Sequence, residues 1–105
     1  MTINYICSPY KSQTPQQHQI HLEYAKELSK RITLSLGAVI TPHLYYPLFL
    51  DDNVEREREI GMESALDLLK VCDTLVVGQK HGISSGMQME IDFAKKNNID
   101  IIYTN

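Results

Sequence analysis

The acidic residue Glu90 occupies an unusual position, because it projects from the apolar side of a predicted helix. The segment from Ser85 to Asn97 has helical periodicity, and at about 100° per residue its apolar side chains fall on one arc around Glu90. A carboxylate in that position must be desolvated, paired with another group or used in chemistry. Arg58 lies in the same way on the apolar arc of a second predicted helix. Two charges on buried faces near helix N-termini predict one shared pocket.

Glu90 has two interpretations. It is either a structural carboxylate, paired with buried backbone or with Arg58, or a nucleophile or base in a cleft. The nearby helix N-terminus favours the ionised carboxylate, whereas burial disfavours it. An ionised carboxylate with little water around it can attack an electron-poor carbon. Arg58 likewise either binds a phosphate or carboxylate of a substrate or forms an internal ion pair. Its acidic partners in that pair would be Glu55, Asp52 or Glu90.

Two further carboxylates, Asp51 and Asp52, lie just before the second helix. Asp52, followed three residues later by Glu55, resembles a capping box, so we expect it to begin that helix. Asp51 has no evident structural role. Either aspartate is a candidate for the acid that protonates a leaving group.

The motif Ser84-Ser85-Gly86 precedes the Glu90 helix. It is either a plain N-cap or a site where hydroxyl and free N–H groups bind phosphate or sugar hydroxyls. Met87 then shapes an apolar wall. Aromatic and polar side chains gather near the predicted strand ends, where they either sandwich a planar base or simply pack the loops; they are Tyr5, Tyr10, His43, Tyr45 and Tyr46.

Composition limits the function classes. The 105 residues carry a formal net charge of -3, which argues against broad binding to nucleic acids or anionic membranes. No apolar run approaches the roughly 20 residues of a membrane-spanning helix, and no secretory signal pattern is present, so we expect a cytoplasmic protein. Cys7 and Cys72 lie in or beside apolar strands, and we expect free thiols. Neither they nor His43 have metal-ligand spacing, so we expect no metal and no cofactor.

Strands alternate with helices along the chain. We expect strands at 2–7, 38–41, 73–78 and 99–103, and helices at 16–36, 53–70 and 85–97. In the first helix His18 and His21 are expected in solvent, and the core face comprises Ile20, Tyr24, Leu28, Ile32 and Leu36. The core face of the second helix comprises Val54, Gly61, Met62, Ala65, Leu68 and Leu69.

This order predicts a single three-layer α/β domain over residues 1–105, with a parallel sheet covered on both faces. Right-handed crossovers favour the strand order 2-1-3-4 of a small flavodoxin-like or Rossmann-like sheet. Ligands of such sheets bind beyond the carboxyl ends of the strands. The loops at that edge are 8–14, 42–52 and 78–85, which adds Ser8, Pro9 and Gly78 to the candidate binding residues.

Several segments together point to a known family. The last third contains Asp73-Thr-Leu-Val-Val-Gly, then Ser85-Gly-Met-Gln-Met-Glu90-Ile-Asp-Phe-Ala94 and the closing Ile-Asp-Ile-Ile-Tyr103. With the opening Tyr5-Ile-Cys-Ser-Pro9 and the middle segments Thr41-Pro-His-Leu-Tyr45 and Phe49-Leu-Asp-Asp-Asn53, they resemble the nucleoside 2-deoxyribosyltransferase superfamily. Within it, the chain is similar to a compact subgroup of small, often phage or mobile-element, proteins. The resemblance covers nearly the whole chain.

The resemblance implies roles for individual residues. In the family's enzymes a glutamate attacks C1′ of a deoxynucleoside, expels the base and holds a deoxyribosyl ester until a second base or water takes the sugar. By position that nucleophile corresponds to Glu90, and the tyrosine that steadies it corresponds to Tyr5. Ser85 replaces a carboxylate frequent in the family, as in members that hydrolyse deoxynucleoside monophosphates. Ala65 stands where the resemblance implies an acidic residue that contacts the base.

The sequence therefore predicts an enzyme that cleaves or exchanges the N-glycosidic bond of a nucleoside or its 5′-monophosphate. Ser8, Ser85, Gly86 and Arg58 would hold sugar or phosphate. One alternative is a module that binds a nucleotide or an ADP-ribose-like ligand without turning it over. Another is a structural domain in which Glu90 and Arg58 pair internally. Family members complete their pockets across a subunit interface, so the resemblance also implies a homo-oligomer, a dimer or larger.

Overall fold

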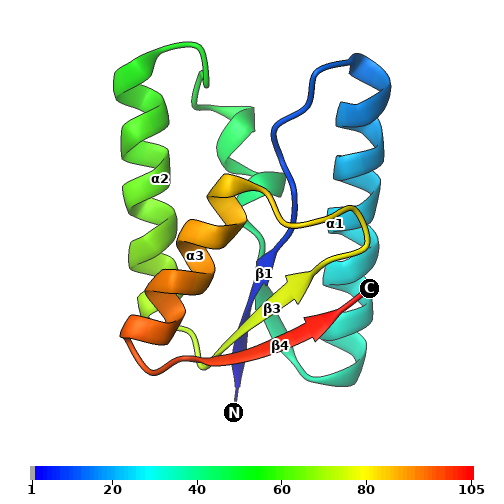
Figure 1. Ribbon diagram of the computed structural model, residues 1–105, viewed down its shortest axis with the longest axis vertical. Coiled ribbons are helices and arrows are strands. Elements are labelled where there is room, and N and C mark those ends of the chain that lie inside the picture. Colours follow the sequence, from blue (N-terminus) through cyan, green and yellow to red (C-terminus); the bar gives the residue numbers. More distant parts are fainter. Residues whose placement is uncertain (1) are drawn as a thin grey trace.

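Within residues 2–105, the part of the chain that the computed structural model describes, four strands and three α-helices form the fold (Figure 1). The strands are β1 (Ile3–Cys7), β2 (Ala38–Ile40), β3 (Thr74–Gly78) and β4 (Asp100–Thr104). They form one sheet in the order β2-β1-β3-β4, and every neighbouring pair is parallel. The predicted fold class and strand order are confirmed.

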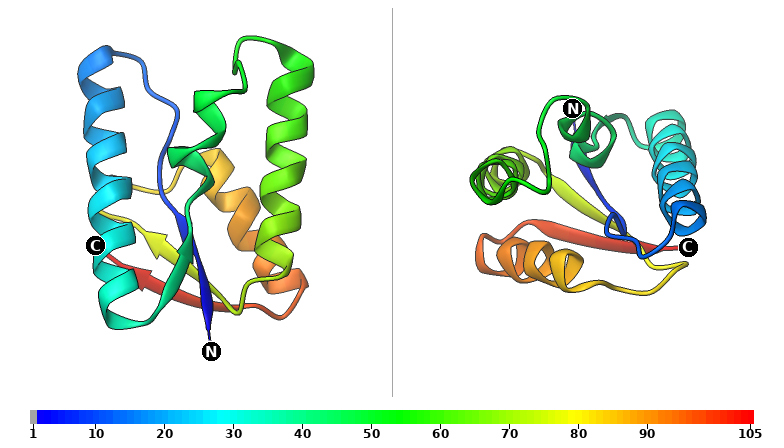
Figure 2. Two further views of the ribbon diagram at one scale, coloured as in Figure 1. Left: turned by 180° about the vertical axis from the view of Figure 1, so that it is seen from behind. Right: turned by 90° about the horizontal axis from the view of Figure 1, so that it is seen from above.

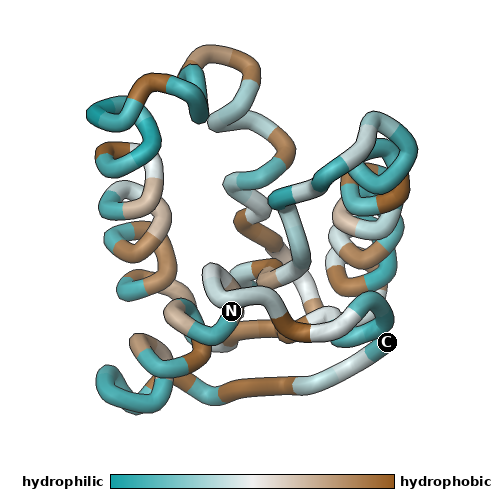
Figure 3. Tube along the Cα trace, turned by 45° about the horizontal axis from the view of Figure 1, so that its top comes forward, coloured by the Kyte–Doolittle hydropathy of each residue, from teal (hydrophilic) through white to brown (hydrophobic). Residues whose placement is uncertain are grey.

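The helices cover both faces of this sheet. Figure 1 shows α1 (Pro15–Ser35) on one side and α2 (Glu55–Lys70) and α3 (Ser85–Lys96) on the other. Successive side chains of a strand point to opposite faces of the sheet, so β1 contributes side chains to two hydrophobic cores, one on each face. Ile6 packs with Tyr24 and Leu28 of α1, whereas Tyr5 and Cys7 pack with residues of α2 and α3. Figure 3 shows hydrophobic and hydrophilic positions alternating along the helices, as this one-sided burial requires.

The buried stripe of α1 differs from the predicted one. Ile20 and Leu36 are 51% and 48% exposed and stay outside the core, whereas His21 is only 7% exposed. His21 stands three residues before Tyr24, so it continues the stripe by one helical turn. The ring of His81 lies 5.0 Å from that of Tyr24 and covers this end of the helix. The prediction of a solvated His21 is therefore wrong.

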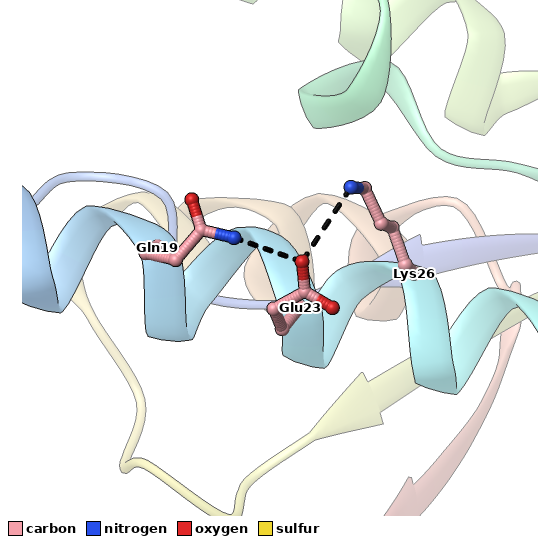
Figure 4. A network of polar contacts seen from close by, with 3 residues as sticks. All are labelled: Gln19, Glu23 and Lys26. Atoms are coloured by element: carbon pink, nitrogen blue, oxygen red, sulfur yellow. Dashed lines mark hydrogen bonds and ion pairs between the residues drawn. The ribbon is translucent and has the colours of Figure 1, made fainter.

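The outer face of α1 carries short-range polar contacts. Gln19 Nε2 donates a hydrogen bond to Glu23 Oε1 at 2.8 Å, and Lys26 Nζ lies 3.6 Å from the same oxygen (Figure 4). Exposed pairs at this helical spacing stabilise a helix by only about 0.3–0.5 kcal/mol. This face of α1 is the solvent side.

α2 and the segment before it enclose a space above the sheet. The predicted 42–52 loop contains two 3-10 turns, η1 (Pro42–Leu44) and η2 (Tyr46–Leu48), which lie between α1 and α2 in Figure 2. Figure 1 shows α2 rising beyond the carboxyl ends of the strands. Val54 and Met62, predicted as core, are 42% and 43% exposed, and within α2 only Leu69 is fully buried. The amino-terminal half of α2 therefore has an apolar side that the sheet does not cover.

The prediction of a capping box at the start of α2 is wrong. Val54 occupies the N-cap position, and no side chain caps the helix. Asp51 has the structural role instead: its Oδ1 accepts a hydrogen bond from Asn53 N–H at 2.9 Å, and its own N–H donates to Glu57 Oε1 at 2.9 Å. Asp51 thus shapes the turn into α2, which leaves the side chain of Asp52 available.

Candidate functional site

Glu90 lies on the inner side of α3. The helix begins where Ser84 Oγ accepts a hydrogen bond from Met87 N–H at 3.2 Å, so Ser84 is its N-cap. Glu90 is 8% exposed, and its helical neighbours Met87 and Ile91 are each 2% exposed. A carboxyl group therefore sits in the apolar layer between α3 and the sheet, as the periodicity of this segment predicts.

The hydroxyl group of Tyr5 donates a hydrogen bond to Oε2 of Glu90. Tyr5 lies in the middle of β1 and is completely buried. Because β1 is a central strand, flanked by β2 and β3, the tyrosine ring has little freedom to move. The arrangement fixes one oxygen of the carboxyl group and leaves the other for a further contact.

Burial controls the ionisation of this group. Desolvation raises the pKa of Glu90 from 4.5 to about 7, and the hydrogen bonds from Tyr5 and Cys7 oppose part of that rise. Burial, followed by the charge of Glu90, raises the pKa of Tyr5 well above its ordinary range. Tyr5 therefore remains a hydroxyl donor, while Glu90 is close to half ionised near neutral pH.

Glu90 forms part of the wall of a cavity of about 340 Å³ at the carboxyl edge of the sheet. This volume falls within the roughly 300–1,000 Å³ of small-molecule sites. One wall is apolar and comes mainly from α2, where Gly61, Met62, Ala65 and Leu66 line the space. The uncovered side of α2 is thus the wall of the cavity.

A second wall is polar. Ser84, Ser85 and Gly86 line the cavity at the start of α3, and Ser8 lines it from the end of β1. The first N–H groups of an α-helix have no acceptor within the helix, and those of Ser85 and Gly86 precede the first capped N–H group. Ser8 is completely buried, and its Oγ has no hydrogen-bond partner among the described residues. This wall therefore offers unused donors to an anion or a sugar hydroxyl.

A third wall combines rings with a carboxylate. Tyr10, His43 and Asp52 line the cavity, and the rings of Tyr10 and His43 meet edge to face at 5.1 Å. Burial lowers the pKa of His43 to about 4, although the charge of Asp52 acts in the opposite direction. His43 is therefore a neutral imidazole at neutral pH, and it presents a flat polar surface beside the cavity.

The charged groups on the cavity wall are not paired with one another. Lys11 and Arg58 supply positive charge, and Asp52 and Glu57 supply negative charge. Among residues 2–105, the ion pair that forms is Lys26 with Glu23, far from this site. The internal Glu90–Arg58 pair considered from the sequence therefore does not form.

Several predicted residues lie outside the cavity wall. Tyr5 acts on the site through Glu90, and Asp51 shapes the turn. Pro9 and Tyr45 do not line the space. Gly78 faces α1, because a Cβ atom there would lie 2.6 Å from both Leu28 Cδ2 and Tyr24 Oη.

Sequence reasoning did not single out several lining residues, which include Lys11, Pro42, Pro47, Leu50, Glu57, Leu66 and Met89. Lys11 falls inside the predicted 8–14 loop and could have been included with Tyr10. Glu57 belongs to a run of alternating charges that resembles a solvated helix surface. Whether Glu57 faces the cavity depends on how α2 is oriented over the sheet, and the sequence pattern does not determine that orientation.

Comparisons with known proteins agree with this fold. Residues 2–104 match the model of the family described as Domain of unknown function (DUF7768), and the chain belongs to that family. No curated protein matches the sequence. A solved structure described as 2-desoxiribosyltransferase from Leishmania mexicana is similar, with a TM-score of 0.65 and 12% sequence identity. The similarity covers 98% of this chain and 63% of that one, so this chain spans less than two thirds of its length.

Two further findings concern residues 2–105. No helix in that range is long and apolar enough to cross a membrane. No group of three or more histidine, cysteine, aspartate or glutamate residues in that range is arranged to hold a metal ion.

Proposed function

We propose that this cavity binds a nucleoside or nucleoside 5′-monophosphate and cleaves its N-glycosidic bond through Glu90. The main support is the buried carboxyl group of Glu90, which Tyr5 orients at the wall of a cavity large enough for a small molecule. The likeness of the fold to a 2-desoxiribosyltransferase supports the same class of chemistry.

The reaction needs few groups. A carboxylate oxygen of Glu90 attacks C1′, the C1′–N bond breaks, and its electron pair leaves with the base. The transition state resembles an oxocarbenium ion, which a nearby carboxylate stabilises before bonding to it. Attack by water on C1′ of the resulting ester then releases the sugar and restores Glu90. A second base in place of water would make the reaction a transfer.

The departing base needs a proton. Asp52 is the better placed of the two predicted candidates, because it lines the cavity while Asp51 is engaged in the turn before α2. The neighbouring rings of Tyr10 and His43 provide a surface for the base. The base would therefore lie on the side of the cavity formed by η1 and the loop after β1.

The same cavity also suits a phosphate group. Ser8, Ser85 and Gly86 offer hydroxyl and N–H donors, and Lys11 and Arg58 add positive charge to the lining. A 5′-monophosphate therefore fits this cavity better than an uncharged nucleoside does.

The direct test is release of free base. The purified protein is incubated with a panel of deoxynucleosides and their 5′-monophosphates, and free base is measured by liquid chromatography. Glu90→Ala should reduce the rate by at least about 10³-fold, because the nucleophile is lost. Asp92→Asn is the matched control, since Asp92 lies on the exposed side of α3 and its side chain accepts a hydrogen bond from Gln88. Equal rates for wild type and Glu90→Ala across the panel would refute the proposal.

A binding module is the second candidate, and the apolar wall of α2 favours it. Ala65 lines the cavity where the resemblance implies an acidic residue for the base. A site without that group can hold a nucleotide or an ADP-ribose-like ligand without turning it over. Calorimetric binding of an intact nucleotide, with no base released over the same period, would select this candidate.

The cavity is also compatible with a homo-oligomer. Leu48 and Phe49, next to the lining residue Leu50, are 81% and 65% exposed. A second copy placed against this segment would bury both side chains. Sedimentation of the purified protein measures whether such an assembly forms.

A further inference from the structure

We propose that the apolar wall formed by α2 makes this cavity selective for a nucleoside 5′-monophosphate whose base carries an alkyl substituent, the simplest of which is a methyl group. This selectivity rests on the proposed function, because it concerns the substrate of the same site. It should show in binding as well as in turnover, so the two proposals can fail separately.

The wall on α2 is one helical face without a hydrogen-bonding side chain. Its members stand three or four residues apart in pairs, which places them side by side on the helix; they are Gly61, Met62, Ala65 and Leu66. All four lie in the interior of α2, where backbone N–H and C=O groups bond to one another within the helix. The wall therefore offers a bound base neither a donor nor an acceptor.

The charged residues of α2 lie at the outer end of the same helix. Glu57 and Arg58 line the cavity about one helical turn before Gly61, close to the N-terminus of α2. Figure 1 shows this end of α2 far from the sheet. The charge that α2 contributes to the lining is thus confined to its outer turn, and the wall becomes apolar toward the sheet.

The apolar wall meets the wall of rings at Leu50. Leu50 lines the cavity just after η2, and its N–H group donates a hydrogen bond to the carbonyl oxygen of Tyr46 at 2.8 Å. A Cβ atom on Gly61 would lie 3.2 Å from Leu50 Cδ1, so this segment packs directly against α2. A base that lies flat on the rings of Tyr10 and His43 would therefore present an edge, rather than a face, to the apolar wall.

The chemistry of that edge determines the selectivity. An N–H or C=O group turned toward the wall would give up its hydrogen bond to water and find no partner. An alkyl group loses no hydrogen bond there, and its apolar surface leaves water. Met62 adapts to the added volume, because its side chain is unbranched and 43% exposed. One methyl group should therefore strengthen binding by roughly tenfold, the low end of what a methylene group contributes in an apolar enzyme pocket.

The first experiment compares intact nucleotides that differ by one methyl group. The 5′-monophosphates of deoxyuridine, deoxycytidine and deoxyadenosine are each paired with the methylated form, which is that of thymidine, 5-methyldeoxycytidine or N6-methyldeoxyadenosine. Isothermal titration calorimetry measures each dissociation constant for the full chain with Glu90→Gln, so that no nucleotide is cleaved during the titration. The methylated nucleotide should bind about tenfold more tightly in at least one pair. Equal binding within all three pairs would overturn the inference.

The second experiment tests whether the preference comes from the α2 wall. Leu66→Ala shortens the wall and should reduce the preference to less than about threefold. Leu68→Ala is the matched control, because Leu68 is a partly buried leucine of the same helix that packs against the same core but does not line the cavity. It should keep the tenfold preference. A preference that both variants keep, or that both lose, would overturn the inference.

A third variant changes the chemistry of the wall without removing core volume. Ala65→Ser adds one hydroxyl group to the wall, which gives a polar base edge a partner. The unmethylated nucleotide of the discriminating pair should therefore bind more tightly than before, and the preference for the methylated one should narrow. An unchanged preference in this variant would show that the base edge does not face α2, and would also overturn the inference.

The two proposals fail in different ways. Base release that depends on Glu90 but has equal kcat/KM within every pair would reject the selectivity and keep the enzyme. Tighter binding of a methylated nucleotide, without base release from any nucleotide of the panel, would reject the enzyme and keep the selectivity as a property of a binding module. Absence of binding by every nucleotide would reject both.

Discussion

The buried carboxyl group of Glu90 should make the stability of the protein depend on pH, and Glu90→Gln should remove that dependence. The amide of glutamine has nearly the same shape, and its oxygen can still accept the hydrogen bond from Tyr5. It cannot ionise. The difference between the two proteins therefore isolates the ionisation of this one residue, since every other titrating group is common to both.

The sign and size follow from linkage. The pKa of Glu90 is about 7 in the folded protein against 4.5 as its ordinary value. Between these values the folded state binds more protons than the unfolded state, so stability falls as pH rises. Each pKa unit corresponds to about 1.4 kcal/mol. The wild type should therefore lose on the order of 3 kcal/mol relative to Glu90→Gln between pH 4.5 and pH 8, with most of the loss complete just above pH 7.

Urea unfolding of both proteins at half-unit steps from pH 4.5 to pH 8.5 measures this difference. We expect the two curves to differ least at acidic pH, with the variant increasingly favoured up to about pH 8. Asp92→Asn, on the exposed side of α3, should track the wild type. Parallel curves for wild type and Glu90→Gln would refute the reasoning, because they would mean that Glu90 has an ordinary pKa in the folded state.

Two further outcomes are expected. Tyr5→Phe removes a hydrogen bond that lowers the pKa of Glu90. In a plot of the rate of base release against pH, the rising part of the curve should therefore move to higher pH by about one to two units. A curve that does not move would show that Tyr5 has no role in the ionisation of Glu90. Gly78→Ala should destabilise the fold by about 1–3 kcal/mol in urea, because its Cβ would lie 2.6 Å from Leu28 and Tyr24. Gly86→Ala, whose Cβ meets nothing closer than 4.0 Å, is the control, and equal losses would contradict the packing argument.

The strands and their order could be predicted because each step depends on local signals. Short apolar runs between turn residues mark the strands, and the right-handed crossover rule leaves few orders for a βαβ chain. Glu90 was found for the same reason: the period of α3 alone determines which side chains share its inner face. The cavity beside Glu90 depends instead on how segments that are far apart in the sequence pack together.

The remaining features depend on tertiary packing that a single sequence does not contain. The apolar stripe of α2 is visible in the sequence, but whether the sheet covers it depends on how far α2 extends past the strands. Asp51 and Asp52 offer the same capping chemistry, and only the backbone of the turn selects Asp51 for the structural hydrogen bonds. His21 was misplaced because its burial depends on His81, sixty residues away in the sequence.

The energetics of Glu90 favour the proposed functional role over a purely structural one. A residue kept for stability should stabilise the fold at the pH where the protein works, yet burial places the ionised form of Glu90 at a disadvantage there. An uncharged side chain of similar size would fill the same space without that cost. The hydroxyl group of Tyr5 donates to the carboxylate and so reduces the cost of its ionised form without abolishing it. A buried donor aimed at a charge that the fold disfavours is the arrangement that the proposed reaction needs, because it keeps a reactive carboxylate dry.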